Sequence, residues 1–181
     1  MTTKSRLYLA LGIILVFIII AAIFASGLVQ FPGTNKQTFG TLQVSITDAP
    51  VDLANLNVTV NGLAVNSADN NTWIQLKFSN DGTEVYFDLL ALHNVTKDLS
   101  ITQLPVGNYS KIRLDIKTAN ATYTDGTTTD LTVPPGHIDV SVSFQIKENQ
   151  ETKLLIDMQA DTTAISQSNN LKPILKATVE Q

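Results

Sequence analysis

One uninterrupted apolar segment near the N-terminus constrains this chain more than any other feature. No side chain between Leu7 and Ala25 is charged, and the next charged residue is Lys36. At about 1.5 Å of rise per residue, a helix over this segment is roughly 30 Å long, which matches the hydrocarbon thickness of a bilayer. In lipid, such a segment satisfies its backbone hydrogen bonds only as a helix. Residues 7–26 are therefore predicted to form one transmembrane helix that anchors the chain in the lipid bilayer.

The charges beside this segment predict its orientation. Lys4 and Arg6 precede it, and no cation follows it closely. The positive-inside bias places residues 1–6 in the cytoplasm and the rest of the chain outside. The prediction is a single-pass protein of the cell membrane, with its N-terminus inside and its C-terminal domain outside.

Two other interpretations of the segment stay open. A cleaved signal peptide usually has an apolar core of about 7–15 residues that ends at a small-x-small site. Here the apolar run is longer, and the site that ends at Ala25 begins with the bulky Ile23. The other interpretation is an N-terminal helix that packs inside a filament. All three interpretations export the remainder of the chain.

Composition excludes several classes of protein. The chain has 12 Lys and Arg against 16 Asp and Glu, a net charge of −4. This acidic balance argues against nucleic acid as a partner, because phosphates require basic surfaces. The chain has no cysteine, which excludes disulfides, zinc–thiolate sites and thiol catalysis. An exported domain of this kind must be stabilised by its core and its sheets.

Five sites fit the Asn-x-Ser/Thr sequon and are candidates for N-glycosylation: Asn57, Asn70, Asn94, Asn108 and Asn120. In an exported protein such sites indicate a cell-surface glycoprotein. The alternative is that a chain rich in Asn and Thr contains sequons by composition alone. Both interpretations stay open.

Alternation of apolar and polar residues predicts an all-β extracellular domain over residues 39–181. Residues 27–38 contain Pro, Gly and polar residues without a helical period, which is typical of a linker. From residue 41 to 47 the alternation has the period of two that marks a half-buried strand. Similar segments follow at 56–60, 63–65, 73–78, 111–118, 121–124, 130–133, 138–146, 152–158 and 173–179.

These nine to ten short strands predict an antiparallel β-sandwich, immunoglobulin-like overall. Asn61-Gly62 predicts a tight turn or a bulge, and the more continuously apolar Glu84–Leu92 is expected at the centre of the fold. The predicted core comprises Leu42, Val44, Ile46, Val58, Val60, Phe87, Leu89, Ile112, Leu114, Ile116, Leu155 and Ile156.

Several ordered blocks of sequence resemble one family. They are GTLQVSITDAPVD from Gly40, FDLLAL from Phe87, LPVGNYSKIRL from Leu104, and the closing segments LIDM from Leu155 and LKPIL from Leu171. Together they resemble the family catalogued as domain of unknown function 4382, from about residue 39 to 179. The resemblance implies an exported β domain of bacteria and archaea, often anchored by a lipid or a helix. It implies no activity.

The pattern Leu-Pro-x-Gly-x-Tyr in the third block predicts a tight turn that leads into a strand. Gly107 can adopt the positive φ that tight turns often require, and the ring of Tyr109 is expected to pack over the corner. The same device occurs in transthyretin-like and starch-binding-like sandwiches. By analogy, that subtype is the predicted topology.

No catalytic motif accompanies the strands, so the chain is predicted not to be an enzyme. His93 and His137 have no sequence relation to each other and are expected to be ordinary loop or strand residues. Paired carboxylates for glycoside hydrolysis would have to lie close together. The sequence brings no such pair together from its candidates Asp48, Asp52, Asp88 and Asp157.

Asp48 and Asp52 are weak candidates for a metal site. Two carboxylates four residues apart around Pro50 could offer oxygen ligands to calcium. The favoured interpretation is that Asp48 caps the turn through backbone amides. The prediction is therefore no metal and no cofactor, with calcium as the alternative.

Surface side chains suggest weaker alternatives. Arg113 and Lys117 are expected on the solvated face of a strand, with binding of carbohydrate or an acidic partner as the alternative. A carbohydrate face needs exposed rings, for which the candidates are Trp73, Tyr86, Tyr109 and Tyr123. We expect Trp73 in the core instead.

The leading hypothesis is a non-enzymatic, membrane-anchored cell-surface module with an envelope-structural or adhesive role, whose partners are envelope glycans or surface proteins. One alternative is a carbohydrate- or ligand-binding module. The other is a filament subunit, in which Leu28–Phe39 adds as a donor strand to the open sheet edge of a neighbour.

Overall fold

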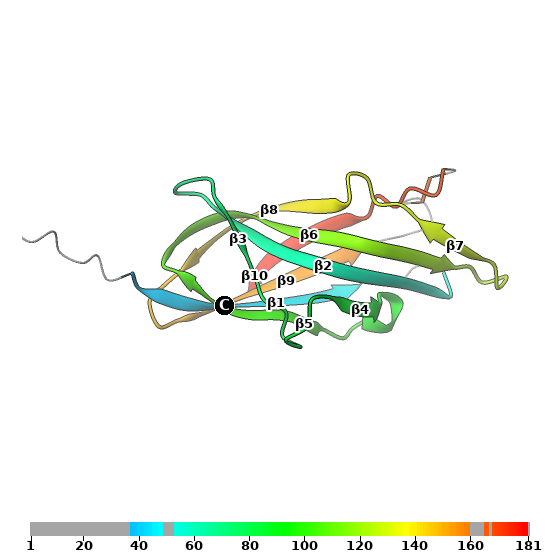
Figure 1. Ribbon diagram of the computed structural model, residues 1–181. Helices are drawn as coiled ribbons and strands as arrows, with labels where there is room; N and C mark the ends of the chain where they lie inside the picture. Colours follow the sequence, from blue (N-terminus) through cyan, green and yellow to red (C-terminus); the bar gives the residue numbers. More distant parts are fainter. Residues whose placement is uncertain (1–36, 49–52, 160–164, 167, 181) are drawn as a thin grey trace, which may run out of the picture. The chain divides into compact units, whose positions relative to one another are not determined.

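Two β-sheets pack against each other in the described part of the chain (Figure 1). The computed structural model describes residues 37–48, 53–159, 165–166 and 168–180. The predicted anchor at 7–26, the N-terminus at 1–6, most of the 27–38 linker and Asp52 lie outside these residues. No helix in the described ranges combines the length and apolarity needed to cross a membrane.

The first sheet, sheet A, has the strand order β10-β9-β1-β5. Its strands are β1 (Phe39–Asp48), β5 (Lys97–Pro105), β9 (Glu151–Gln159) and β10 (Ile174–Glu180). β1 pairs with β5 in the antiparallel sense and with β9 in the parallel sense. The prediction of a wholly antiparallel sandwich is therefore wrong at the β1–β9 pair. Alternation identifies the buried face of a strand, but it says nothing about the direction of the neighbouring strand.

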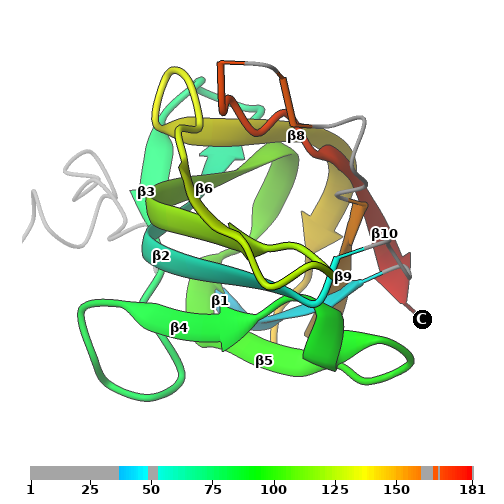
Figure 2. The same ribbon diagram turned by 90° about the vertical axis from the view of Figure 1, so that its right-hand side faces the viewer.

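The second sheet, sheet B, is built on the long antiparallel pair β2 (Asn55–Ser67) and β6 (Gly107–Thr122). β3 (Trp73–Gln75) and β4 (Val85–Asp88) both pair with β2, while β7 (Thr128–Leu131) and β8 (His137–Ile146) both pair with β6. A single turn of 3-10 helix, η1 (Leu90–Leu92), follows β4. The end-on view in Figure 2 shows the strands wrapped around a common interior.

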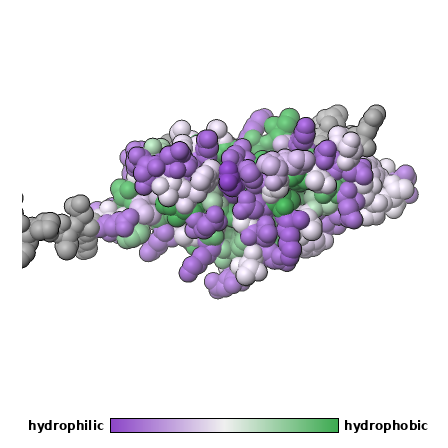
Figure 3. Space-filling view, turned by 45° about the horizontal axis from the view of Figure 1, so that its top comes forward, coloured by the Kyte–Doolittle hydropathy of each residue, from purple (hydrophilic) through white to green (hydrophobic). Residues whose placement is uncertain are grey.

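Alternating apolar side chains fill this interior, as predicted. Ten of the twelve predicted core residues are buried: Leu42, Val44, Ile46, Val58, Val60, Phe87, Leu89, Ile112, Leu114 and Ile156. Polar side chains cover much of the face shown in Figure 3, with apolar patches scattered between them. The period-two pattern thus predicts the inner face of most strands.

Two predicted core residues lie elsewhere. Leu155 is on the outer face of β9, whose buried residues are Leu154, Ile156 and Met158. Because successive strand residues point to opposite faces, Leu155 and Ile156 cannot both be buried in one interior. Ile116 is only partly buried against the core, since the β6 ladder is interrupted immediately after it.

Strand boundaries differ from the prediction at several places; for example, the predicted segments 56–60 and 63–65 are one strand, β2. β5 was not predicted, because an extra residue at Leu99 shifts its register against β1 and breaks the alternation. The predicted strands 111–118 and 121–124 are one strand, β6. Glu84–Leu92 is not central: it contains β4, which pairs only with β2 in the described sheets, although Phe87, Leu89 and Leu92 still reach the core.

The predicted corner at Tyr109 is present. The Tyr109 hydroxyl donates a hydrogen bond to the Pro105 carbonyl at 2.9 Å, across the turn that contains Gly107. The ring is buried and stacks on Phe144 with a centroid distance of 5.2 Å. Burial raises the pKa of the Tyr109 hydroxyl. The corner ties the end of β5 in sheet A to the start of β6 in sheet B.

Candidate functional site

Two β-bulges lie close together in the central pair of sheet B. β2 has an extra residue at Asn61 relative to β6, and β6 has an extra residue at Lys117 relative to β2. The Asn61-Gly62 dipeptide therefore forms a bulge and not a tight turn. Bulges bend and twist a strand and occur often beside functional sites. We call this region, residues 60–62 of β2 and 116–118 of β6, the waist.

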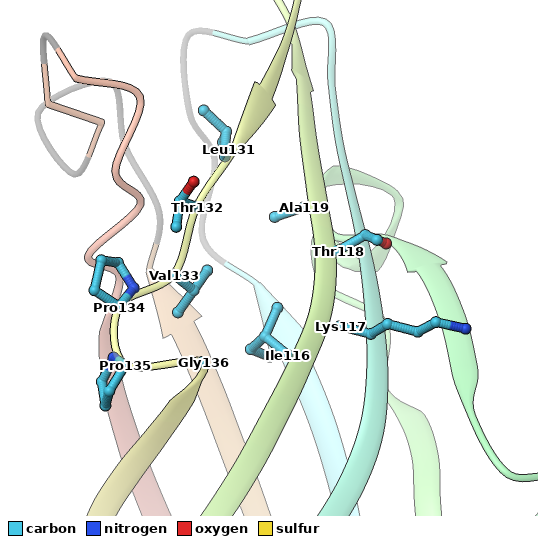
Figure 4. Close-up of a pocket in the computed structure, with 10 residues that line it drawn as sticks. All are labelled: Ile116, Lys117, Thr118, Ala119, Leu131, Thr132, Val133, Pro134, Pro135 and Gly136. Carbon is cyan, nitrogen blue, oxygen red and sulfur yellow. The ribbon is translucent and has the colours of Figure 1, made fainter.

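A cleft with a mixed polar and apolar lining opens on the β6 side of the waist (Figure 4). β6 pairs with β8 as far as Asp115 and with β7 from Ala119 onward, and the connection 132–136 bows away between these two pairings. The resulting cleft has a volume of about 410 Å³. Figure 4 shows Ile116 and Val133 inside it, whereas Lys117 points away. The cleft therefore exists because, among the described strands, β6 has no neighbour on this side between Asp115 and Ala119.

A second cleft opens on the β2 side of the waist. β2 pairs with β4 up to Val60 and with β3 from Ala64, so residues 61–63 lie between the two pairings. The cleft between this segment and the β3–β4 connection has a volume of about 490 Å³. Its lining is mixed and includes Gln75, Phe78 and Asp81. The central pair thus has an opening on each side at the level of the bulges.

The waist carries an ion pair and a further carboxylate. The Lys117 ammonium donates to the Glu84 carboxylate at 2.6 Å, and both side chains are about half exposed. The carboxylate of Asp115 lies over Gly62, where a Cβ atom would be only 2.2 Å from Oδ2. Only a glycine leaves room for this carboxylate, so the glycine of the bulge positions an acidic group on the outer face.

Trp73 lies on the same outer face, under an arginine. The Cζ atom of Arg113 is 4.3 Å from the centroid of the Trp73 ring. Nε and Nη2 of Arg113 donate to the two carboxylate oxygens of Asp139 at 2.6 and 2.8 Å. This ion pair lowers the pKa of the Asp139 carboxyl and raises that of the Arg113 guanidinium. The prediction that Trp73 belongs to the core is wrong.

The register explains the position of Trp73. It pairs with Asn66 of β2, which alternates with Leu63 and Val65 and so lies on the face opposite these two core residues. On β3 the inward residue is Ile74, which packs against the core. Trp73 is therefore on the opposite face of its strand, and the guanidinium of Arg113 covers its ring. Arg113 and Lys117 lie on the outer face, as expected.

The exposed rings do not form a platform for stacking on one sugar unit. Tyr86 is 63% exposed and donates to the Asn57 side chain at 2.7 Å. It pairs with Thr59 of β2, whereas Trp73 pairs with Asn66. At about 3.3 Å per residue, the two rings are roughly 20 Å apart along the strand. Tyr109 is buried, and Tyr123 is partly buried against the core.

The candidate acids do not converge. Asp88 accepts hydrogen bonds from the Leu56 and Leu90 amides at 3.0 and 3.2 Å in sheet B, while Asp157 belongs to β9 of sheet A. Asp48 is the last residue of β1 and only 6% exposed; Asp52 lies outside the described residues. Among the residues that the structure describes, no group of three or more His, Cys, Asp or Glu could hold a metal ion.

The two histidines occupy separate places. His93 is exposed after η1, with Nε2 2.9 Å from the Asn94 amide nitrogen. His137 begins β8 and pairs with Asp115. The five sequons divide similarly: Asn57, Asn108 and Asn120 lie in strands, whereas Asn70 and Asn94 lie in connections.

Sequence reasoning missed the waist, although a signal for it exists. The buried positions of β6 are even-numbered at Ile112 and Leu114 but odd-numbered at Ala119 and Ala121. A change of phase within one strand is what a bulge produces. The same change in the sequence was interpreted as a boundary between two strands.

Fold and site together define the described domain as a β-sandwich whose central strand pair is bulged and flanked by two clefts. A sequence model of the family described as "Domain of unknown function (DUF4382)" matches residues 39–177. The chain therefore belongs to this family, as the resemblance predicted.

Other comparisons add little. No curated protein matches the chain significantly. The chain is similar to a leucine-rich repeat protein from Bacteroides thetaiotaomicron VPI-5482, a solved structure, at 14% identity and a TM-score of 0.28. The similarity covers 66% of this chain but only 13% of that protein. Nothing about this chain follows from a likeness at that score.

Proposed function

We propose that this chain is a non-enzymatic cell-surface module, anchored in the membrane by residues 7–26, with an envelope-structural or adhesive role. The observation that carries the proposal is the position of β1. This strand follows the linker directly and lies between β5 and β9 in sheet A. A tether that enters at Phe39 is thus joined to an interior strand of the sheet.

An interior first strand suits a domain that is held by its N-terminus. β1 pairs with β5 over Phe39–Ile46 and with β9 over Thr41–Asp48. The hydrogen bonds on both edges run across the strand, so a pull along β1 loads them together and not one after another. The outer face adds the Ser45 and Gln43 side chains, which both donate to Asp98. This arrangement resists extraction of the strand to which the anchor connects.

Three acidic side chains are already engaged in hydrogen bonds within the fold, which supports a non-enzymatic role. Asp88 binds backbone amides beside η1, Asp98 binds two side chains of β1, and Asp139 binds Arg113. Each of these carboxylates stabilises a strand pairing or a turn. The corner at Tyr109 also supports the transthyretin-like or starch-binding-like subtype, which is part of this proposal.

Membrane fractionation tests the anchor. The full chain should stay with membranes through a carbonate wash, and a variant without residues 1–26 should not. Protease added to intact cells that lack a wall barrier should degrade the domain. Release of the full chain by carbonate, or a mature protein without residues 1–25, would contradict the anchor.

A ligand-binding module is the second candidate, favoured by the clefts of about 410 and 490 Å³ on the two sides of the waist. Trp73 is the only tryptophan of the chain, so its fluorescence reports on the outer face of sheet B. Oligosaccharides purified from the envelope should change this emission saturably if the face binds them. A Gln75→Ala variant, which changes the lining of the second cleft, should weaken binding at the waist.

The filament alternative requires a groove that accepts a donor strand. The cleft beside β6 extends from Ile116 to Ala119, which is about 13 Å at 3.3 Å per residue. That length is short for the segment Leu28–Phe39, so this cleft gives the filament alternative no support. Imaging of purified envelopes with an antibody to the domain distinguishes filaments from dispersed anchored copies.

A further inference from the structure

The sequons differ in how their middle residues are held. In the three strand sequons the middle residues are Val58, Tyr109 and Ala121, which are 1%, 3% and 0% exposed. In the two connection sequons the middle residues are Asn71, which is exposed, and Val95, which is 55% exposed. A transferase that grips the sequon backbone would have to pull a core side chain out of the sandwich at the strand sites only.

The strand sequons are also held by the sheet. Asn57 and Asn120 face each other as direct cross-strand partners in β2 and β6. Their amides are bound, with Asn57 accepting from Tyr86 at 2.7 Å and Asn120 donating to Asp130 at 2.8 Å. Directly opposed residues have Cβ atoms about 4.5–5.5 Å apart, so this pair has no room for two glycans. The amide nitrogen of Asn120, which would be the nucleophile, is already a hydrogen-bond donor.

Asn70 has the opposite setting. Its carbonyl accepts from the Thr72 amide at 3.1 Å, which folds the sequon into an Asx turn at the tip of the β2–β3 hairpin. Asn71 adopts a left-handed conformation with φ of 55°, and residues 68–72 are all exposed. The whole sequon therefore projects from the sandwich.

Asn94 lies in a similar setting after η1. It has φ of 56°, and residues 93–96 are all exposed. Its amide nitrogen contacts only the exposed His93 ring among the side-chain partners that the structure describes, a contact that water can replace. Asn94 lies near the end of β1, because Asp48 and His93 form an isolated β-bridge through their backbones. Asn70 lies elsewhere, near the Tyr109 corner.

We propose that Asn70 and Asn94 are the N-glycosylation sites of this protein, and that the strand sequons stay unmodified. The inference rests on the proposed cell-surface location. The co-substrate is a lipid-phosphate-linked oligosaccharide. The Asn side-chain nitrogen bonds to the first sugar carbon, and the bond from that carbon to the phosphate oxygen breaks. The lipid phosphate leaves with the electron pair, and one amide proton passes to a base of the transferase.

Glycopeptide mass spectrometry tests the inference on the full chain, produced in cells that attach N-linked glycans to envelope proteins. A reference glycoprotein from the same cells shows that the machinery is active. Peptides with Asn70 and Asn94 should carry glycan, and peptides with Asn57, Asn108 and Asn120 should not. Thr72→Val should remove one glycan mass, while Thr72→Ser, which keeps the sequon, should retain it. Thr96→Val and Thr96→Ser should behave in the same way.

The outcomes separate this inference from the proposed function. An anchored and exported chain that lacks a glycan at Asn70 or Asn94, or carries one at a strand sequon, overturns the inference and leaves the proposed function intact. A chain that stays in the cytosol overturns both.

Discussion

The guanidinium of Arg113 covers one face of the Trp73 ring, with Cζ 4.3 Å from the ring centroid. Arg113 is also held by its two hydrogen bonds to Asp139. A planar cation held in this way shields the indole from water and interacts with its π system. The three residues join β3, β6 and β8 across the outer face of sheet B.

Removal of the cation should expose the indole. In the folded Arg113→Ala variant, we expect Trp73 emission at a longer wavelength and stronger quenching by iodide than in the parent chain. Lys117→Ala is the matched control, because Lys117 binds Glu84 instead, and its spectrum should match the parent. Identical spectra for Arg113→Ala and the parent would contradict the stack.

Leu114 is completely buried at the centre of β6. Leu114→Ala should lower the free energy of unfolding by about 2–5 kcal/mol, because it removes buried methyl groups and leaves a cavity. Leu155→Ala removes the same atoms from the outer face of β9 and should cost less than about 1 kcal/mol. Urea denaturation of both variants measures the difference. Equal losses would mean that the faces of β9 are assigned incorrectly.

Gly62 and Asp115 should be energetically coupled. A Cβ at Gly62 would meet Oδ2 of Asp115 at 2.2 Å, so Gly62→Ala should lower the unfolding free energy by about 1–3 kcal/mol through overpacking. Asp115→Ala removes the obstructing carboxylate, and the double variant should regain part of the loss. A double-mutant cycle measures this coupling. Strict additivity would show that the carboxylate does not occupy this space.

Acid should weaken sheet A through Asp98. Hydrogen bonds from Ser45 and then Gln43 lower the pKa of this carboxyl from 3.8. A carboxyl with a lower pKa in the folded state contributes stability above the unfolded-state pKa, and that stability is lost as pH falls through the folded-state pKa. The loss should therefore occur below about pH 4.

Ser45→Ala tests this assignment. It removes the main donor, so the pKa of Asp98 should rise toward its ordinary value, as measured by carboxyl NMR titration. The acid-dependent part of the unfolding free energy should shrink in parallel. Thr41→Ala, on the same strand face, is the control and should leave the titration of Asp98 unchanged.

Calcium should not stabilise the domain. A specific ion would raise the unfolding free energy by about 2.7 kcal/mol at a hundredfold excess over Kd. We expect the melting curves in millimolar calcium and in EDTA to coincide, both for the parent chain and for Asp48→Asn. A higher melting temperature in calcium for the parent alone would contradict this prediction and show that the Asp48–Asp52 segment binds calcium.

Regular alternation made much of the fold predictable. The alternation that begins after Gly40 predicts the strand and inner face of β1, and Pro-x-Gly-x-Tyr predicts the Tyr109 corner. Both depend on interactions between residues near in sequence, which a local pattern records. The direction of β9 beside β1 depends on the course of the chain between them, for which no local pattern exists.

Bulges account for most of the remainder. The extra residues at Leu99 and Lys117 reverse the phase of β5 and β6, so one strand was missed and another was divided. The waist exists because of such phase changes, and its clefts depend on loops that bow away from the sheet. The apolar character of Trp73 predicts burial in the core. In the structure its ring is instead covered by the side chain of Arg113, which is distant in sequence.

The parallel pairing of β1 with β9 has a consequence for the order of folding. Strands β2 to β8 all lie between these two partners in the sequence, so β1 can pair with β5 early but gains its second neighbour only near the end of the chain. Sheet B takes all its strands from the stretch between β2 and β8, in which only β5 belongs to sheet A, and it can assemble while the C-terminus is still being synthesised. Contacts between distant parts of a chain form slowly. Sheet A, and with it the firm attachment of the N-terminal strand, is completed only when the final strands have emerged.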